Sequence, residues 1–344
     1  MDERKITMVH GSGGSATSEL INEIFAREYA DRTLDEMEDA AVVPGAGTLA
    51  MTTDSFVVTP LQFRGGDIGR LCVCGTVNDL LMRGAIPKYL TCGFILEEGL
   101  SVETLKQLVH SMAETAREAG IRVVAGDTKV IEGNGGLYIN TAGVGFIPDG
   151  VDIRAEKAAV GDAILVSGTL GDHHAAILSE RMEIETDIES DAAPLRQMVD
   201  SLISSGLPIH SFRDVTRGGL GTVLKELAVA SGKVFEIEEE KIPVTAKVQD
   251  FCGLLGLDPI YMGNEGKMVV ILPAEYANQA LEIMKSCRYG ENAVQIGTVL
   301  AAAAGESAAG GESYNAGGEL ICKTAIGGRR RLDVLQGEGL PRIC

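Results

Sequence analysis

The sequence predicts an α+β protein of two domains. At 344 residues, the chain exceeds the usual size of one domain. Its first half alternates strand-like and helix-like segments but also contains a hairpin, which favours α+β over a parallel doubly wound sheet. The pattern pauses at a predicted hinge at residues 148–150 and restarts with segments of similar make-up. We therefore expect an N-terminal domain at residues 1–150, a C-terminal domain at 151–328 and a flexible tail at 329–344.

The elements of the first half follow from periodicity and from capping residues. Residues 48–58 are rich in β-branched and apolar residues, and they predict a strand that contains one carboxylate, Asp54. Apolar residues recur at helical spacing between Ser101 and Gly120, which are typical of the start and end of a helix. The Gly-rich residues 132–136 predict a hairpin turn. The other expected elements are a buried helix at 67–83 and strands at 88–96, 121–125 and 137–147.

The second half also contains both predicted helices and predicted strands. We expect helices beginning near His173 and at 194–203, 218–230 and 274–287, and strands at 163–168, 234–238, 267–272 and 294–299. Residues 301–319 are polar and of low complexity, which predicts a mobile loop because they have little to bury. Beyond Gly328 no apolar periodicity predicts an element, and the sixteen residues from Arg329 to Cys344 could extend over roughly 50 Å.

Composition argues against several classes of protein. The net charge of −19 opposes binding to a phosphate backbone, so no nucleic acid partner is expected. No stretch approaches the roughly 18 uncharged apolar residues of a membrane span, and no apolar signal core follows the N-terminus. The seven cysteines are spread along the chain, which argues against a disulfide framework. We expect a cytoplasmic protein without membrane contact.

A glycine-rich turn near the N-terminus is a candidate phosphate-binding loop. It contains His10, Gly11, Ser12, Gly13 and Gly14 and leads into a predicted helix. Glycines allow backbone N–H groups to converge on an anion, and a helix N-terminus favours negative charge. Taken alone, a flexible turn without a ligand is the simpler interpretation of the same residues. The common phosphate-loop and dinucleotide fingerprints do not occur in the sequence.

Carboxylates beside glycines or inside apolar segments recur along the chain: Asp54, Asp67, Asp79, Asp127 and Asp214. A carboxylate in a buried segment is costly unless it is paired or bound to a cation. Mg²⁺ prefers hard oxygen ligands and bridges phosphates, so together with the glycine-rich turn these residues predict a magnesium and triphosphate site. Taken singly, each could instead be a helix cap or a satisfied core carboxylate.

Two more polar residues lie at the ends of expected strands. Lys129 follows Asp127, and Glu265 precedes the strand at 267–272. Each is either a simple surface group or part of a site, where the lysine would contact phosphates and the glutamate would act as a base. His173 and His174 could bind a metal, but hydrogen bonding at the start of a helix is the simpler interpretation.

These motifs occur together, and in this order, in one known family. The sequence resembles the HypE hydrogenase maturation factors, which belong to the superfamily of aminoimidazole ribonucleotide (AIR) synthetase, selenophosphate synthetase and thiamin-monophosphate kinase. The resemblance runs the whole length of the chain. The segments that carry it are HGSGG at 10–14, TTDSFVVTP at 52–60, GTVNDLLMRGA at 75–85, AGDTKV at 125–130, DVTRGGLGTVL at 214–224, GNEGK at 263–267 and PRIC at 341–344.

The resemblance implies a fold, partners and a reaction. It implies two α+β domains of the AIR synthetase (PurM-like) type, a homodimer joined through the sheets of the N-terminal domains, and ATP bound in the cleft between domains. A carbamoyltransferase, HypF, would load a carbamoyl group on Cys344, and ATP would phosphorylate the carbamoyl oxygen. Loss of phosphate would leave a thiocyanate, whose cyanide reaches the iron of [NiFe]-hydrogenase through the HypC–HypD complex.

The resemblance also assigns roles by position. The expected magnesium ligands are Asp54, Asp79 and Asp127. The expected nucleotide contacts are His10, Gly11, Gly13, Gly14, Asp54, Asn78, Asp79, Asp127, Thr128 and Asp214. The expected catalytic residues are Cys344 as the carbamoyl carrier, Glu265 as the base and Lys129 beside the phosphates. Two alternatives stay open: a small-molecule kinase or synthetase of the same superfamily, and a non-catalytic docking module.

Overall fold

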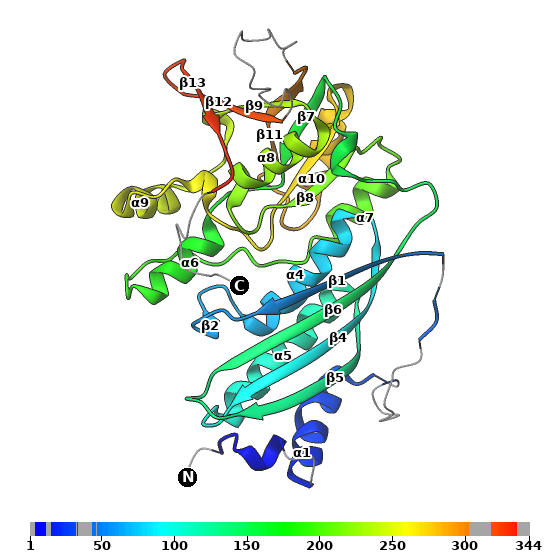
Figure 1. The fold of residues 1–344 in the computed structure, drawn as a ribbon, viewed down its shortest axis with the longest axis vertical. Helices are drawn as coiled ribbons and strands as arrows, with labels where there is room; N and C mark the ends of the chain where they lie inside the picture. The colour runs from blue at the N-terminus through cyan, green and yellow to red at the C-terminus, as the bar shows by residue number, and fades with distance from the viewer. Residues whose placement is uncertain are drawn as a thin grey trace, which may run out of the picture.

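The computed structural model describes residues 4–11, 15–31, 33, 43–45, 47–302 and 318–335. In these residues the chain forms two halves, each built on its own β-sheet with helices packed against it (Figure 1). None of the helices in the described ranges combines the length and the apolar composition that a membrane span needs.

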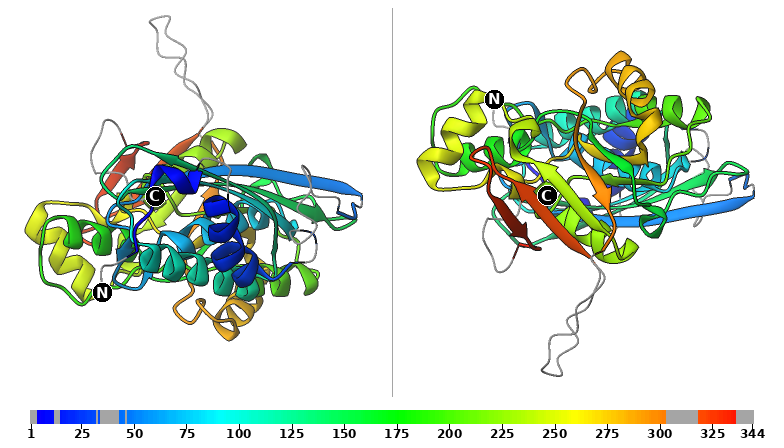
Figure 2. Two further views of the ribbon diagram at one scale, coloured as in Figure 1. Left: turned by 90° about the horizontal axis from the view of Figure 1, so that it is seen from below. Right: turned by 90° about the horizontal axis from the view of Figure 1, so that it is seen from above.

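The first half contains a four-stranded sheet in the order β1-β6-β4-β5, in which β4 and β5 are parallel and the other neighbours antiparallel. Its elements are η1 (Met8–Gly11), α1 (Ser15–Leu20), the π-helix η2 (Ile21–Ala26), α2 (Arg27–Tyr29), β1 (Thr48–Phe56), β2 (Gln62–Phe63), β3 (Gly66–Asp67), α4 (Ile68–Met82), β4 (Ile86–Glu97), α5 (Val102–Ala119), β5 (Arg122–Ile131) and β6 (Leu137–Ile147). Helices α4 and α5 cover one face of the sheet (Figure 2).

Helix α4 lies at the junction of the two halves. Asp67 caps it, since its Oδ1 accepts a hydrogen bond of 2.8 Å from the backbone N–H of Arg70. This helix is apolar almost all round because it packs against β1 and β6 on one side and against α5, α7 and β8 on others. The last turns of α4 therefore bring Asn78 and Asp79 to the boundary between the halves.

The second half contains a seven-stranded sheet in the order β13-β12-β9-β11-β7-β10-β8, antiparallel except for the pair β12 and β9. Its elements are η3 (Ala155–Lys157), β7 (Asp162–Val166), α6 (Asp172–Arg181), α7 (Arg196–Ser204), β8 (Ser211–Asp214), α8 (Gly219–Ser231), β9 (Val234–Glu238), η4 (Glu239–Lys241), α9 (Ala246–Leu255), η5 (Pro259–Tyr261), β10 (Met268–Pro273), η6 (Ala274–Tyr276), α10 (Ala277–Ser286), β11 (Val294–Leu300), β12 (Glu319–Lys323) and β13 (Arg329–Leu332). Its buried strands β7 and β10 pair in the middle of the core.

The elements expected from the sequence are present, and the structure adds several more. Strand β5 runs to Ile131, beyond the expected end at residue 125, because it pairs with β4 along its length. Strands β8, β12 and β13 and helix α9 were not predicted. Strand β13 was missed because its arginines give no apolar pattern; they pair instead with acidic neighbours such as Glu236 and Asp258. Most of the expected mobile loop, residues 303–317, lies outside the described residues.

Candidate active site

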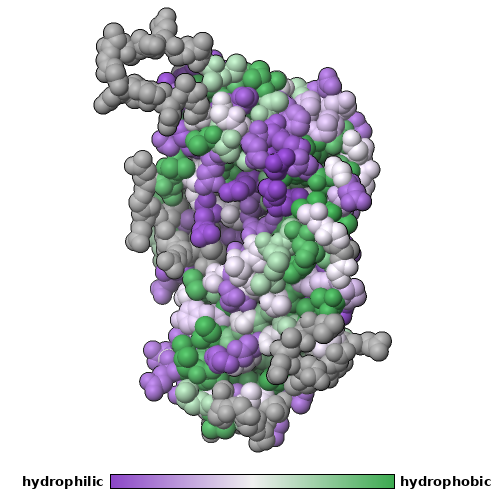
Figure 3. Space-filling model, turned by 45° about the vertical axis from the view of Figure 1, so that its right-hand side comes forward, coloured by the Kyte–Doolittle hydropathy of each residue, from purple (hydrophilic) through white to green (hydrophobic). Residues whose placement is uncertain are grey.

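A cleft of about 1140 Å³ separates the two halves. Strand β1 and the end of α4 form one wall, and β8, the start of α8 and the segment before β10 form the other. Figure 3 shows hydrophilic residues gathered on the upper half of the molecule, whereas hydrophilic and apolar residues are interspersed over the lower half. Both walls of the cleft contain polar side chains, including Thr52, Asp54 and Ser55 on β1 and Arg213, Arg217 and Glu265 on the opposite wall.

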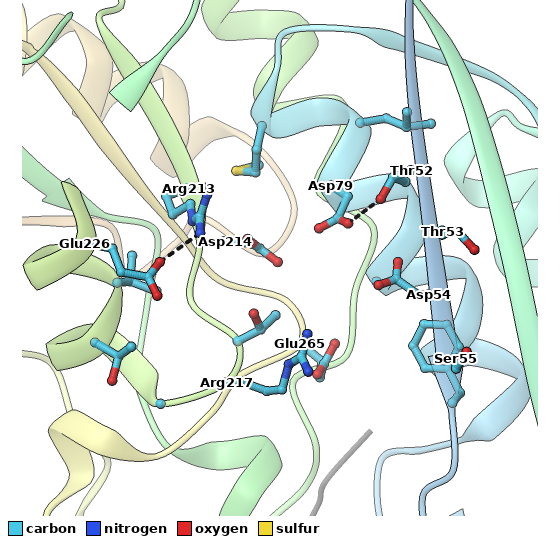
Figure 4. Close-up of a pocket in the computed structure, with 18 of the residues that line it drawn as sticks. Thr52, Thr53, Asp54, Ser55, Asp79, Arg213, Asp214, Arg217, Glu226 and Glu265 are labelled. Atoms are coloured by element: carbon cyan, nitrogen blue, oxygen red, sulfur yellow. Dashed lines mark hydrogen bonds and ion pairs between the residues drawn. The ribbon is translucent and has the colours of Figure 1, made fainter. Parts of the chain in front are cut away.

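Five carboxylates line this space (Figure 4): Glu226 pairs with Arg213, and the other four come from four separate segments. Asp54 comes from β1, Asp79 from α4, Asp214 from the end of β8, and Glu265 from the loop before β10. Two threonines orient the pair in the first half. The hydroxyl of Thr52 donates to Asp79 Oδ2 at 2.7 Å, and that of Thr76 donates to Asp54 Oδ2 at 3.1 Å.

The carboxylates raise one another's pKa values. Burial raises the pKa of Asp54, and the negative charge of Asp79 raises it further. Burial, followed by the charge of Asp79, raises the pKa of Asp214 to about 6. Glu265 is 4% exposed, and burial and the neighbouring carboxylates raise its pKa well above the usual range. The cleft thus holds more negative charge than its side chains balance, which suits a bound divalent cation.

The opposite wall has features that suit an anion. Arg213 and Arg217 line the cleft, and Arg213 also pairs with Glu226 at 2.8 Å. Helix α8 begins at Gly219, and Gly218, Thr222 and Val223 line the cleft, so the N-terminal end of the helix, which favours negative charge, lies at the cleft wall. Gly219 has φ +62°, and a Cβ there would lie 2.6 Å from the carbonyl oxygen of Ile260, so only glycine fits this start of the helix.

The structure corrects the prediction that Asn78 contacts the nucleotide. It precedes Asp79 on α4, but its side chain is 2% exposed and is not part of the cleft lining. Consecutive helical residues point about 100° apart, so the two side chains cannot both face the cleft. The Asn78 amide instead donates to the carbonyl oxygen of Ala193 at 3.0 Å and accepts from Leu195 N at 2.9 Å.

Asp127, Thr128 and Lys129 also do not reach the cleft of their own chain. They lie on β5, at the opposite edge of the sheet from β1. Lys129 Nζ and Asp127 Oδ1 form an ion pair of 2.8 Å, with the two side chains 65% and 67% exposed. The expected metal site of Asp54, Asp79 and Asp127 therefore does not assemble within one chain, and the described residues contain no other cluster of three such ligands.

The described start of the glycine-rich turn lies beside β5. His10 and Gly11 belong to η1, which contacts β5, and His10 Nδ1 accepts a hydrogen bond of 3.0 Å from Thr7 N. Gly13, Gly14 and Cys344 lie outside the described residues. The described phosphate-side groups, His10, Gly11, Asp127, Thr128 and Lys129, thus share one edge of the sheet, away from the carboxylates.

Sequence reasoning missed two groups of the site. Thr52 lies two residues from Asp54 on the same strand, so the period of two could have identified it. Arg213 and Arg217 flank Asp214 in a predicted motif, but arginines beside glycines look like surface residues.

His174, which the sequence offered as a metal ligand or as a hydrogen-bonding residue at the start of a helix, also lines the cleft. Its Nδ1 accepts a hydrogen bond of 3.2 Å from Gly263 N. Burial lowers its pKa to about 3, so the ring is neutral.

Comparisons with known proteins decide the family. The model of the AIR synthase related protein N-terminal domain matches residues 37–147, and that of the C-terminal domain matches residues 159–308. Carbamoyl dehydratase HypE of Azotobacter vinelandii is 46% identical, covering 98% of this chain and 97% of that protein. Carbamoyl dehydratase HypE of Escherichia coli K12 is 44% identical, covering 98% and 99%. The chain belongs to the HypE family.

Solved structures agree with this assignment. A crystal structure of hydrogenase maturation protein HypE in complex with ATP superimposes with a TM-score of 0.91 at 44% identity, covering 98% of this chain and 99% of that one. HypE in a HypE–HypF complex gives 0.77 at 44% identity, covering 92% and 99%. Thiamine monophosphate kinase of Aquifex aeolicus, at 20% identity and a TM-score of 0.58 over 81% and 95%, shares the fold alone. The predicted AIR synthetase-like α+β fold and the predicted family are confirmed.

Proposed function

We propose that this protein is an ATP-dependent carbamoyl dehydratase. It converts an S-carbamoyl group on Cys344 to a thiocyanate, which supplies cyanide ligands to the iron of [NiFe]-hydrogenase. The observation that carries this proposal is the cleft, which brings the four carboxylates of Asp54, Asp79, Asp214 and Glu265 together with two arginines and the N-terminal end of α8. Membership of the HypE family, whose members in A. vinelandii and E. coli are named carbamoyl dehydratases, supports the reaction.

The wall of the cleft formed by β8 and α8 suits the triphosphate of ATP. The N-terminus of α8 and the guanidinium groups of Arg213 and Arg217 favour its negative charge. Asp54 and Asp79 would hold magnesium, because their carboxylates lie close enough to raise the pKa of Asp54. Magnesium bound there would offset the charge of the phosphate oxygens during phosphoryl transfer.

The carboxylate cluster also suits the dehydration step. An amide oxygen leaves poorly as hydroxide, so transfer of the γ-phosphoryl group to the carbamoyl oxygen first makes it a good leaving group. Phosphate then departs as the nitrogen loses its two protons, which forms the C≡N bond. We assign Glu265 as the base for this nitrogen because burial makes its ionised carboxylate more basic than an exposed one.

The end of the described chain leads to the same cleft. Leu335 lines it and donates its backbone N–H to the Thr222 hydroxyl at 3.2 Å, while the Tyr261 hydroxyl donates to the carbonyl oxygen of Asp333 at 3.1 Å. The nine residues from 336 to Cys344 could span about 30 Å when extended. That reach supports a Cys344 thiol that binds in turn to HypF, to the cleft of its own protein and to a HypC–HypD acceptor. The solved HypE–HypF complex supports HypF as the first of these partners.

We also propose a homodimer in which a second copy completes each cleft. The face of the first sheet opposite α4 and α5 exposes apolar side chains: Leu49 and Met51 on β1, Ile95 on β4 and Ile131 on β5. Two copies joined through this sheet could bring the β5 edge of one beside the β1 edge of the other. Asp127, Thr128, Lys129 and the glycine-rich turn would then reach the partner's nucleotide.

The domain division follows the sequence prediction. We assign residues 1–150 to the N-terminal domain, 151–328 to the C-terminal domain and 329–344 to the tail. The gap between the two matched family models, from 147 to 159, supports the break at the hinge. The first part of this expected tail is not free: β13 pairs with β12, and Asp333 and Leu335 are hydrogen-bonded at the cleft.

Intact-protein mass spectrometry tests the proposed reaction. Wild type incubated with HypF, carbamoyl phosphate, ATP and magnesium should first gain a carbamoyl group and then lose one water. Cys344→Ala should show neither change, and Glu265→Gln should accept the carbamoyl group but retain the water. Wild type that binds ATP and yet stays unmodified beside an active HypF would instead favour a small-molecule kinase.

A further inference from the structure

Glu265 lies in a segment that has no regular secondary structure of its own. It follows η5 and precedes β10, so the backbone hydrogen bonds of a helix or a strand do not hold it. A group that moves protons must nevertheless keep its position closely, because a displacement of about 1 Å can cost roughly 100-fold in rate. The contacts that fix this segment are therefore of functional interest.

Asn78 holds the segment from the other half of the molecule. Its amide nitrogen donates to the carbonyl oxygens of Glu265 at 3.3 Å and Ala193 at 3.0 Å, and its amide oxygen accepts from Leu195 N. The amide nitrogen and the amide oxygen of Asn78 are thus both hydrogen-bonded to backbone groups, and the side chain is buried. One side chain on α4 therefore ties the Glu265 segment to the segment at residues 191–195.

Asp191 holds the same segment from the opposite side. Its Oδ1 accepts the backbone N–H of Glu265 at 3.0 Å, and Ala193 N donates to the Glu265 carbonyl oxygen at 3.3 Å. Its Oδ2 forms an ion pair of 3.2 Å with Lys267, and the two side chains are 5% and 10% exposed. A Cβ on Gly266 would lie 1.9 Å from the Asp191 carbonyl oxygen, so the two segments are in direct contact.

Stability alone does not explain why Asn78, Asp191 and Lys267 are placed around the Glu265 segment. A buried ion pair contributes little net stability compared with apolar packing, because both charges lose their hydration. Here Lys267 lies two residues from the expected base and Asp191 accepts the backbone N–H of that base. None of Asn78, Asp191 and Lys267 lines the cleft. These side chains therefore contact the backbone that carries the base and leave its substrate side open.

We propose that Asn78 and Asp191 are positioning residues for the dehydration step, which fix the Glu265 carboxylate relative to a substrate held across the cleft. This inference rests on the proposed function. Asn78 and Asp79 are neighbours on α4, and Asn78 is hydrogen-bonded to the segment that carries Glu265. This hydrogen bond therefore keeps the distance between Asp79, the expected magnesium ligand, and Glu265, the base, constant.

Single-turnover kinetics with carbamoylated protein test the proposal. Asn78→Ala should slow the loss of water by roughly 10- to 100-fold, while ATP affinity stays at the wild-type value because the cleft lining is intact. Asp191→Asn keeps an acceptor for the Glu265 N–H but loses the ion pair, so a smaller slowing is expected. Arg196→Ala is the matched control: Arg196 directly follows the 191–195 segment and also joins the halves, but through different partners, the carbonyl oxygens of Ala119 at 2.8 Å and Gly120 at 2.7 Å. It should lower thermal stability and leave the rate unchanged.

The outcomes separate this proposal from the proposed function. A folded Asn78→Ala protein that loses water at the wild-type rate overturns the positioning role. If that variant does not fold, Asp191→Asn decides, since a wild-type rate there also overturns it. If Arg196→Ala slowed the loss of water equally, the cause would be a general weakening of the contacts between the two halves. That result would also overturn the positioning role. Failure of wild type to convert, or full activity of Glu265→Gln, would instead refute the reaction or its base.

Discussion

At the scale of single residues, Asp214 is a cleft carboxylate whose charge lowers the stability of the folded protein. Its pKa of about 6 in the folded protein lies above the ordinary value of 3.8, so the folded state binds this proton more tightly than the unfolded state. The contribution of Asp214 to stability is therefore greatest below the unfolded pKa and is lost as the pH rises through the folded pKa. Above that pH the charged carboxylate destabilises the fold, by at most about 3 kcal/mol.

Asp214→Asn should relieve this destabilisation. In metal-free buffer, the free energy of unfolding of the variant should exceed that of wild type well above pH 6, and the gain should shrink as the pH falls toward 4. Denaturant unfolding at a series of pH values measures the difference. A gain that is independent of pH would mean that packing, not charge, causes it. Added magnesium should stabilise wild type more than the variant, because the variant has less charge for a cation to offset.

The carboxylates of the cleft could be predicted because a charge inside an apolar segment is conspicuous. Asp54, Asp79 and Asp214 were identified in this way, whereas Glu265 was identified by its place just before an expected strand. The structure brings these four carboxylates together. Asn78 was assigned by motif to the nucleotide, but an amide beside a ligand and an amide bonded to backbone have the same sequence signature. Its partners, Ala193 and Leu195, are more than one hundred residues away, so local reasoning could not find them.

At the scale of elements, the close approach of α4 to α5 depends on a glycine. A Cβ at Gly69 would lie 2.1 Å from the carbonyl oxygen of Leu108, so the two helices would have to separate. Gly69→Ala should therefore lower the free energy of unfolding by about 1–3 kcal/mol. Gly253 in α9 is the matched control, since nothing lies within 4 Å of its Cβ position. Gly253→Ala should stabilise the protein by about 0.5–1 kcal/mol. Chemical denaturation of both variants checks the pair, and destabilisation by both would contradict the steric explanation.

Elements with local signals were predicted well, and elements defined by distant pairing were not. Ser101 and Gly120 cap α5 as expected, with the Ser101 side chain accepting from Thr104 N and Gly120 at φ +63°. Strands β12 and β13 have no such signal, because they are specified by their place beside β9 and by ion pairs such as Lys323 with Glu236. Pairing partners across long stretches of chain determine strands of this kind.

At the scale of the whole molecule, one chain holds the predicted phosphate-binding groups in two separate sets. The carboxylates and arginines line the cleft beside β1, whereas Asp127 and Lys129 lie at the β5 edge. Sequence motifs show which residues belong to a site but not which copy of the chain supplies them. If the proposed homodimer is correct, the two sets meet across the interface, and each cleft depends on both subunits.

Mixed dimers test this arrangement directly. Asp54→Asn and Lys129→Ala should each convert carbamoylated Cys344 poorly when alone, because every cleft then lacks one group. In an equal mixture that exchanges subunits, half of the dimers are mixed, and each mixed dimer has one cleft with both groups intact. About a quarter of the wild-type activity should therefore return. Ile95→Glu, which places a charge on the open sheet face where Ile95 is 42% exposed, should prevent this recovery by blocking the dimer. No recovery in a mixture whose dimers demonstrably exchange would place Lys129 in the site of its own chain, and the β5 edge would then have to move toward the cleft during the reaction.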